Sequence, residues 1–341
     1  MTERGELVEI GLGIQSNKAP GRYAEVAMRA ERVGVDVLSV FSDLLFQPPL
    51  PALLEMARVT SRVRLGVACW NPYTLHPYEI AGQFAAIDRA SNGRAYLGLA
   101  RGSWLESVGV SQPQPVAHLE EAVGFIRALL GGSGSGFDGD IFRLAPGARL
   151  QYDVARTEVP VLIGSWGPRG ADLAGRVADE LKVGGTSNPA MVEATRSRIA
   201  VGELAAGRPT GSVGVVAGAV TVVSRDGRAA RNLARSEVAM YLDVVAKFDQ
   251  TITLPDGLLD SVGRLVRDGD MDAAGRAIPG DVLDLFAFSG TPDDIAAQAQ
   301  SLIDAGVSRV EFGTPHGFDE LEAIDLIGSA VIPQLDRRRV G

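Results

Sequence analysis

The chain has 341 residues, of which 46% are hydrophobic and 22% charged, and its net charge is −9. This length fits a single (β/α)8 barrel with insertions, or two smaller domains. The acidic balance argues against a nucleic-acid partner, because phosphate backbones need a basic surface. No apolar run reaches the roughly 18 residues that span a bilayer, and the charged start Met1–Glu6 is no signal segment, so we expect a cytoplasmic protein without a membrane anchor.

A single cysteine, Cys69, excludes an internal disulfide and a zinc site built from cysteines. The histidines are scattered along the chain without metal-binding spacing, so we expect no metal site. Nearly all positive charge comes from arginine, since the lysines are Lys18, Lys182 and Lys247.

Short apolar runs alternate with amphipathic stretches, which is typical of repeated βα units around a parallel sheet. We predict eight strands, at residues 8–14, 37–41, 63–69, 95–100, 159–163, 180–183, 213–223 and 308–312. Helices are expected to begin near Pro20, Ala52, Pro77, His118, Gly170 and Glu320. The fold class is therefore an α/β (β/α)8 TIM barrel.

Two segments interrupt the alternation. Residues 131–158 open with a glycine- and serine-rich link and continue as a hairpin laid over the barrel. Residues 226–288 are mostly helical and too interrupted to form a domain of their own. We therefore expect one domain over residues 1–341 with two insertions.

The three tryptophans, Trp70, Trp104 and Trp166, each follow a predicted strand. The carboxyl ends of barrel strands form the mouth where such enzymes do chemistry. The tryptophans are therefore predicted to line one pocket for a planar organic ligand. The alternative is that each tryptophan wedges neighbouring loops together.

A turn of small residues lies between the fifth strand and the next helix. Such a turn leaves backbone N–H groups free at a helix start, where the helix dipole favours an anion such as phosphate. A second turn, with Gly184, Gly185 and Thr186, follows the neighbouring strand and favours the same interpretation. Simple turn chemistry is the alternative. The first turn comprises Gly164, Ser165, Trp166, Gly167, Pro168, Arg169 and Gly170.

Other polar residues follow strands at the mouth. Asp43 could orient or protonate a ligand, or it could cap a helix. Arg101 adds a positive charge, or it is a solvated surface residue. For Cys69 we favour a buried apolar role over that of a nucleophile, because no acid–base pair is evident near it.

Several motifs together resemble a known family. They are Ser42-Asp43, Leu65-Gly66-Val67, Pro77 with Ile80-Ala81, Tyr96 to Leu99, Ile163-Gly164, Phe288 to Asp294, Ala305 to Val307 and Phe312 to Gly317. They are similar to the luciferase-like flavin and deazaflavin oxidoreductases, especially the coenzyme F420-dependent branch that includes methylenetetrahydromethanopterin reductase. The resemblance covers nearly the whole chain.

The resemblance implies an F420 ring, or alternatively an FMN ring, at the barrel mouth, with its phosphate at the turn after strand five. It implies a non-prolyl cis peptide between Ala68 and Cys69 that supports the ring. Asp43 matches the family's acidic position and is the candidate catalytic residue, whereas Leu44 and Ser103 replace a histidine and a glutamate of some members. The implied cofactor-binding residues are Ala68, Cys69, Asn71, Arg101, Gly102, Gly164 to Arg169 and Gly184 to Thr186, and the substrate pocket is Gln15, Trp70 and Trp104.

F420 carries an oligoglutamate tail, so Arg101 and Arg169 become candidate sites for it. The implied reaction is hydride transfer between the deazaflavin and an electrophilic carbon of a small molecule, such as an iminium or C=N group. The two insertions could act as lids. An FMN monooxygenase and a barrel that binds a ring without turnover are the alternatives. A homodimer is expected from the resemblance.

Overall fold

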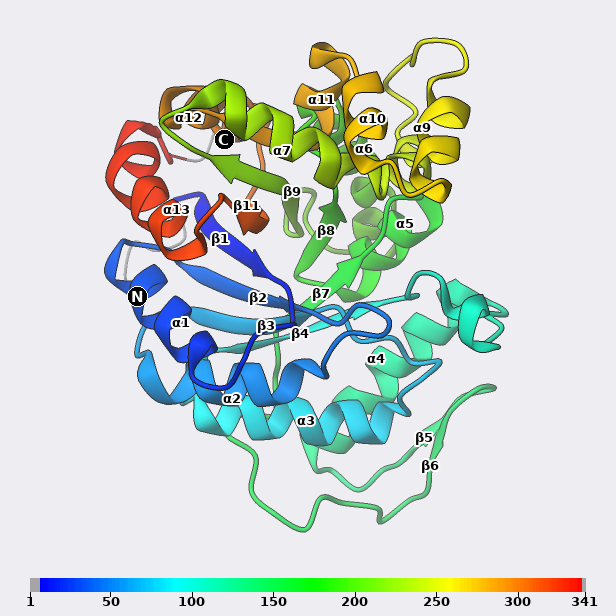
Figure 1. Ribbon diagram of the computed structural model, residues 1–341. Coiled ribbons are helices and arrows are strands. Elements are labelled where there is room, and N and C mark those ends of the chain that lie inside the picture. The colour runs from blue at the N-terminus through cyan, green and yellow to red at the C-terminus, as the bar shows by residue number, and fades with distance from the viewer. Residues whose placement is uncertain (1–6, 339–341) are drawn as a thin grey trace.

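The computed structural model describes residues 7–338, so the charged start Met1–Glu6 lies outside the described residues. Eight parallel strands close into a barrel with helices outside, which confirms the predicted TIM barrel (Figure 1). Closure follows from the pairing of β9 with both β8 and β11. The barrel strands are β1 (Glu9–Ile14), β2 (Val37–Phe41), β3 (Arg64–Ala68), β4 (Ala95–Ala100), β7 (Val161–Gly164), β8 (Glu180–Gly184), β9 (Gly214–Val223) and β11 (Arg309–His316).

A helix connects each strand to the next, and proline stands in the first turn of most of these helices, where its missing N–H is tolerated. Side-chain caps fix several starts: His76 accepts from the Tyr78 N–H, and Thr291 and Asp294 form a capping box. The helices are α1 (Arg22–Arg32), α2 (Pro49–Val59), α3 (Pro77–Ala90), α4 (Pro115–Gly131), α5 (Pro168–Val177), α6 (Pro189–Ala205), α12 (Pro292–Asp304) and α13 (Glu320–Leu326).

Two hydrophobic layers hold the barrel. The outward faces of the strands pack against the helices in one large core. Inside the barrel, four buried side chains form a smaller apolar cluster: Val37, Tyr96, Leu162 and Val216.

The first insertion contains the predicted hairpin, reduced to two short strands, β5 (Phe137–Asp138) and β6 (Arg143–Leu144), which contact α4 (Figure 1). Its return segment is anchored by Arg156. The Arg156 guanidinium donates to both carboxylate oxygens of Asp88, at 3.1 and 2.6 Å, and to the Ala95 carbonyl at 2.6 Å. Because Asp88 is almost fully buried, this pair holds the insertion on α3.

The second insertion is helical, as predicted, and has its own apolar cluster. One difference is β10 (Ala287–Gly290), which pairs in parallel with the end of β9 and was not predicted as a strand. The helix predicted to begin near Glu320 is α13, and after Leu326 the chain continues as π and 3-10 turns. The helices of this insertion are α7 (Gly227–Ala239), α8 (Leu242–Val245), α9 (Leu258–Arg267), α10 (Met271–Ala277) and α11 (Gly280–Phe286). Across residues 7–338, the structure has no helix of the length and apolar character that a bilayer span requires.

Candidate functional site

The inward-facing residues nearest the carboxyl ends of five neighbouring strands form a partly exposed layer. Phe41 pairs with Ala68, and Ala100 pairs with Gly164. Apart from one phenylalanine the layer consists of alanine and glycine, so it offers backbone and methyl groups to a flat ligand. We call this layer the floor; it comprises Phe41, Ala68, Ala100, Gly164 and Gly184.

The third strand carries a β-bulge beside the floor. Gly66 pairs with Tyr96, whereas Trp70 bridges to Leu99, so four steps along β3 oppose three steps along β4. One residue of β3 is therefore extra, which reverses the direction of the side chains that follow it.

Cys69 lies within this bulge, and the peptide bond joining Ala68 to Cys69 is cis, as the resemblance predicted. The Cys69 sulfur lies 3.1 Å from the place where a Cβ on Gly164 would stand and 3.5 Å from that on Gly98. Burial raises the pKa of the Cys69 thiol to about 12 although Lys182 nearby lowers it. The thiol stays protonated at neutral pH, which favours the apolar role over that of a nucleophile.

The tryptophans do not share one pocket. Trp70 is fully buried in the core between strands and helices, so its predicted place in the substrate pocket is wrong. The physical reason is the extra bulge residue, which turns the indole outward. Trp104 is 47% exposed at the start of a short 3-10 helix, and Trp166 is partly exposed on the turn after β7. These two remain on loops at the mouth.

The turn from Gly164 to Gly170 forms a cradle at the start of α5. A Cβ on Gly170 would stand 2.0 Å from the Ser165 hydroxyl oxygen, so only glycine lets the turn pack this closely on the helix. The N-cap is Gly167, which has no side chain to occupy the first-turn N–H groups. Pro168 and Arg169 are exposed. The turn therefore keeps the geometry of an anion site.

Arg198 is a cation beside this turn that the sequence analysis did not identify. It donates from α6 to the carbonyl of Trp166 at 3.2 Å and to Gln250 of the helical insertion at 3.1 Å. The cradle is thus fixed to both α6 and the insertion. No motif marks Arg198, because it lies far from the turn along the chain.

The second predicted turn faces the helical insertion. The Thr186 side chain is fully buried and donates to the Leu285 carbonyl at 3.3 Å. Its predicted role as a phosphate ligand is therefore wrong, because its hydroxyl is already engaged within the protein. Gly184 and Gly185 are partly exposed, and the Gly185 N–H donates a hydrogen bond to the Gly218 carbonyl at 2.6 Å.

Two predicted site residues meet at the ends of β1 and β2. The Gln15 amide donates to the Asp43 carboxylate at 2.8 Å, and the Gln15 carbonyl oxygen accepts from the Ser16 N–H at 2.9 Å. Asp43 is exposed, so its carboxylate is available to a ligand at the mouth.

A second carboxylate lies between the ends of β11 and β1. Glu320 is 2.8 Å from the Lys18 ammonium and 3.7 Å from Nδ1 of the buried His316. Burial by itself raises the pKa of Glu320, but His316 and Lys18 outweigh it and lower the pKa to about 2. Glu320 is therefore ionised at neutral pH.

The loops after β3 and β4 hold the remaining predicted residues. The Asn71 side-chain oxygen accepts from the N–H of Tyr73 at 3.2 Å and of Thr74 at 2.9 Å, so Asn71 shapes its own turn. Gly102 has a φ of +82° and packs closely on Asn71. Arg101 is exposed beside it. The structure thus gives Asn71 and Gly102 structural roles and leaves Arg101 free to meet a ligand.

Ionised side chains also lie inside the barrel, below the floor. Lys182 on β8 forms an ion pair with Glu311 on β11. Glu311 also accepts from the Ser39 hydroxyl at 2.5 Å, and the Tyr96 hydroxyl lies 2.7 Å from that of Ser39. None of these residues was predicted to belong to the site, although charges at alternate positions of a predicted strand, 180 and 182 or 309 and 311, are a signal that could have found Lys182 and Glu311.

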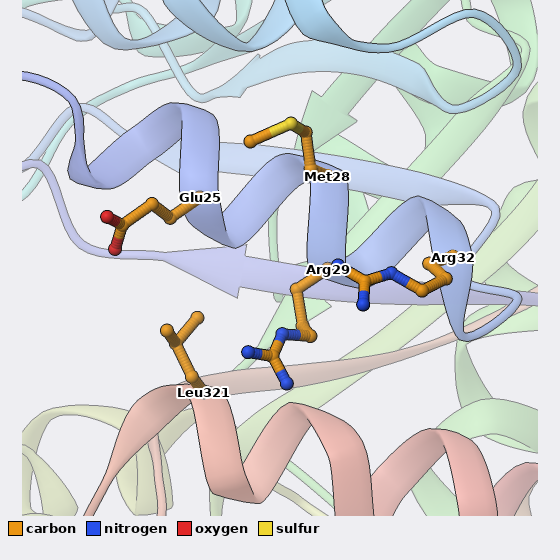
Figure 2. A pocket seen from close by; sticks show the side chains of 5 residues that line it. All are labelled: Glu25, Met28, Arg29, Arg32 and Leu321. Carbon is orange, nitrogen blue, oxygen red and sulfur yellow. The ribbon is translucent and has the colours of Figure 1, made fainter.

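A groove of about 320 Å³ lies on the outer side of the barrel, between α1 and α13 (Figure 2). Its lining is part apolar and part charged, and none of the floor residues contributes to it. This groove is separate from the mouth. It is lined by Glu25, Met28, Arg29, Arg32 and Leu321.

The family model described as luciferase-like monooxygenase matches residues 7–309. The 5,10-methylenetetrahydromethanopterin reductase of Archaeoglobus fulgidus is 32% identical over 293 residues, which cover 83% of this chain and 86% of the relative. An F420-dependent glucose-6-phosphate dehydrogenase of Mycobacterium tuberculosis is 26% identical over 98% of this chain and 100% of its own.

Among solved structures, the coenzyme F420-dependent tetrahydromethanopterin reductase from Methanopyrus kandleri superposes with a TM-score of 0.86. It is 24% identical, and the superposition covers 97% of this chain and 100% of that one. The likeness extends through both insertions, because nearly every residue of each chain is covered. The match to the family model over most of its length shows that this chain belongs to the luciferase-like monooxygenase family.

Proposed function

We propose that this protein is an F420-dependent oxidoreductase that transfers a hydride between F420 and a small organic molecule. The observation that supports this most is the juxtaposition of a flat floor and an anion cradle, which share Gly164. A ring and a phosphate need both features side by side. We propose F420 as the cofactor in preference to FMN because these relatives are named as F420-dependent enzymes.

The residues present fit such a cofactor. The floor fits a ring because Ala68, Ala100, Gly164 and Gly184 are partly exposed and carry no side chain larger than a methyl group. The cradle leaves room for a phosphate because Gly167 carries no side chain at the start of α5, and no atom lies within 4 Å of the place where its Cβ would stand. When bound, F420 supplies the hydride donor or acceptor.

The chain's own residues position the reactants and supply a proton. The cis bulge at Cys69 and the methyl groups of Ala68 and Ala100 support one face of the ring and keep water from it. Asp43, oriented by Gln15, is the proposed proton donor or acceptor for the substrate. The substrate is a small molecule with an electrophilic carbon, such as an iminium or C=N group.

FMN is the alternative cofactor, and a luciferase-like monooxygenase is the alternative function. Two observations support this alternative. The matching family is described as luciferase-like monooxygenase, and the long-chain alkane monooxygenase, a more distant structure, superposes with a TM-score of 0.73. The third hypothesis is a protein that binds a ring without turnover. This hypothesis predicts no hydride exchange with reduced F420.

Titration of the purified protein with F420 and with FMN, at several salt concentrations, tests the proposal. We expect tighter binding of F420 and a loss of that advantage at high salt, because the exposed Arg101 and Arg169 meet its oligoglutamate tail. R101A and R169A should weaken F420 about tenfold and FMN little. R58A, an exposed arginine at the end of α2, should change neither. Equal losses for the two cofactors would contradict the assignment.

We also propose that the protein forms a homodimer, that it acts in the cytoplasm and that it has no nucleic-acid partner. Light scattering after size-exclusion chromatography measures the oligomeric state, and a monomer at micromolar concentration would contradict the dimer. The single domain with two insertions likewise stays a prediction, which one cooperative unfolding transition would support.

A further inference from the structure

The interior of the barrel holds an ionic cluster between its two ends. At the amino-terminal end, Arg64 lies 2.7 Å from Glu9 and 3.3 Å from Glu180. Above them, Arg309 is 3.5 Å from Glu180 and 3.8 Å from Glu311, and its guanidinium stands over the Tyr96 ring. The cluster continues to the Lys182–Glu311 ion pair just below the floor.

Lys182 points from this cluster toward the mouth. Its Cε lies 3.9 Å from the place of a Cβ on Gly184, which is a floor residue two positions further along β8. Its ammonium lies 5.0 Å from the centre of the Phe41 ring, another floor residue. The ammonium therefore reaches the level of the floor.

The exposed part of Lys182 opens to the mouth and not to the other end of the barrel. The side chain of Lys182 is 10% exposed, and that of Glu311 is 2% exposed. Beneath them the barrel is closed, since Arg309 is fully buried and Tyr96 is 1% exposed. A ligand on the floor can thus reach the cation more readily than the carboxylate that holds it.

We infer that Lys182 is the cation that contacts the cofactor ring from below and stabilises its anionic form, with Glu311 as the positioning residue that holds the ammonium in place. A fixed ammonium in a water-poor site attracts negative charge on a neighbouring ring more strongly than in solvent. This inference rests on the proposed function, because it needs the ring to lie on the floor.

The charges around Lys182 come from several strands. Glu311 and Arg309 face it from β11, Cys69 and Asp43 lie toward the mouth, and the hydroxyls of Ser39 and Tyr96 contact Glu311. The Cys69 thiol is protonated and therefore neutral, and Asp43 is at the exposed rim. In the arrangement described, Lys182 is the cation closest to the floor, which makes it the residue to test.

Absorption titration of bound F420 against pH tests the role of Lys182, because F420 has an acidic ring hydroxyl whose deprotonation changes the spectrum. We expect K182M to raise the pKa of the bound ring by about one unit or more relative to the wild type, as loss of a neighbouring opposite charge does. K182R keeps the charge and should restore most of the shift. K247M removes an exposed lysine of the helical insertion and should have no effect.

K182M leaves Glu311 buried without its partner, so the double variant K182M/E311Q provides a form with no unpaired charge in the barrel. There the ring pKa should still rise, by a smaller amount, since the deeper carboxylate is lost as well. Bound F420 that titrates alike in the wild type, K182M and the double variant would overturn the role of Lys182. A wild-type protein that binds no F420 would instead overturn the proposed function itself, and this inference with it.

Discussion

Gly164 lies at the point where the floor meets the cradle, so a single methyl group there tests the site. In G164A the new Cβ would stand 3.1 Å from both the Ala100 Cβ and the Cys69 sulfur, which is closer than ordinary van der Waals contact. Overpacking of this kind costs about 1–3 kcal/mol. With an unfolding entropy of about 2.1 cal/mol/K per residue, this corresponds to a fall in Tm of roughly 1–4 °C for a chain of this length.

The same methyl group enters the space proposed for the ring, so F420 affinity should fall about 10-fold or more. G184A also adds a methyl group to the floor, but its Cβ would be 3.9 Å from Lys182. We expect G184A to lower F420 affinity while leaving Tm within about 1 °C. G131A adds a methyl group in open space at the end of α4 and should change neither. Calorimetry and F420 titration measure both effects. If G164A behaved like G131A, the floor would not be the cofactor site.

Two further predictions concern stability. R156A should cost about 3 kcal/mol and make residues 131–158 more sensitive to proteases, because Asp88 is left buried without its cation. R143A, which breaks a largely exposed ion pair on the hairpin, should cost less than about 0.5 kcal/mol. Limited proteolysis and urea unfolding compare the two, and equal effects would refute the anchoring role of Arg156. Glu320 has a folded pKa of about 2, below its ordinary value, so its contribution of about 3 kcal/mol is present above pH 5 and disappears as pH falls toward 2. E320Q should therefore be destabilised at pH 7 and match the wild type near pH 2, and a stability loss independent of pH would contradict this.

The barrel could be predicted because its strands obey a strict local pattern. Each run from 37 to 41 or from 95 to 100 is short, apolar and followed by a helix that a proline or a capping residue starts. The strand β10 escaped this reasoning because Ala287–Gly290 is short and directly follows a helix of the insertion. Its strand conformation depends on pairing with the end of β9, which is a tertiary contact.

Part of the candidate site could likewise be predicted from the sequence, and part of it could not. The cis bond at Cys69 was predicted from the resemblance, and the turn at Gly164 from its small residues. Trp70 was misplaced because one extra residue in a bulge reverses a side chain, and sequence alternation does not reveal that residue. Thr186 was misplaced because the insertion that buries it lies some 100 residues away.

The ion pair below the floor was missed for another reason. Lys182 and Glu311 are separated by 129 residues and meet only once the barrel closes. In the sequence, each of these charged residues interrupts an apolar strand. A single charge in a strand predicts an exposed position at the edge of a sheet. Two charged positions facing inward from two strands are explained only by their pairing across the interior.

A crystal structure of the protein with F420 tests the central claim most directly. We predict electron density for the ring over Ala68, Cys69 and Ala100, with the phosphate at the turn from Gly164 to Gly170. Density for the cofactor in another place, such as the groove between α1 and α13, would contradict the account.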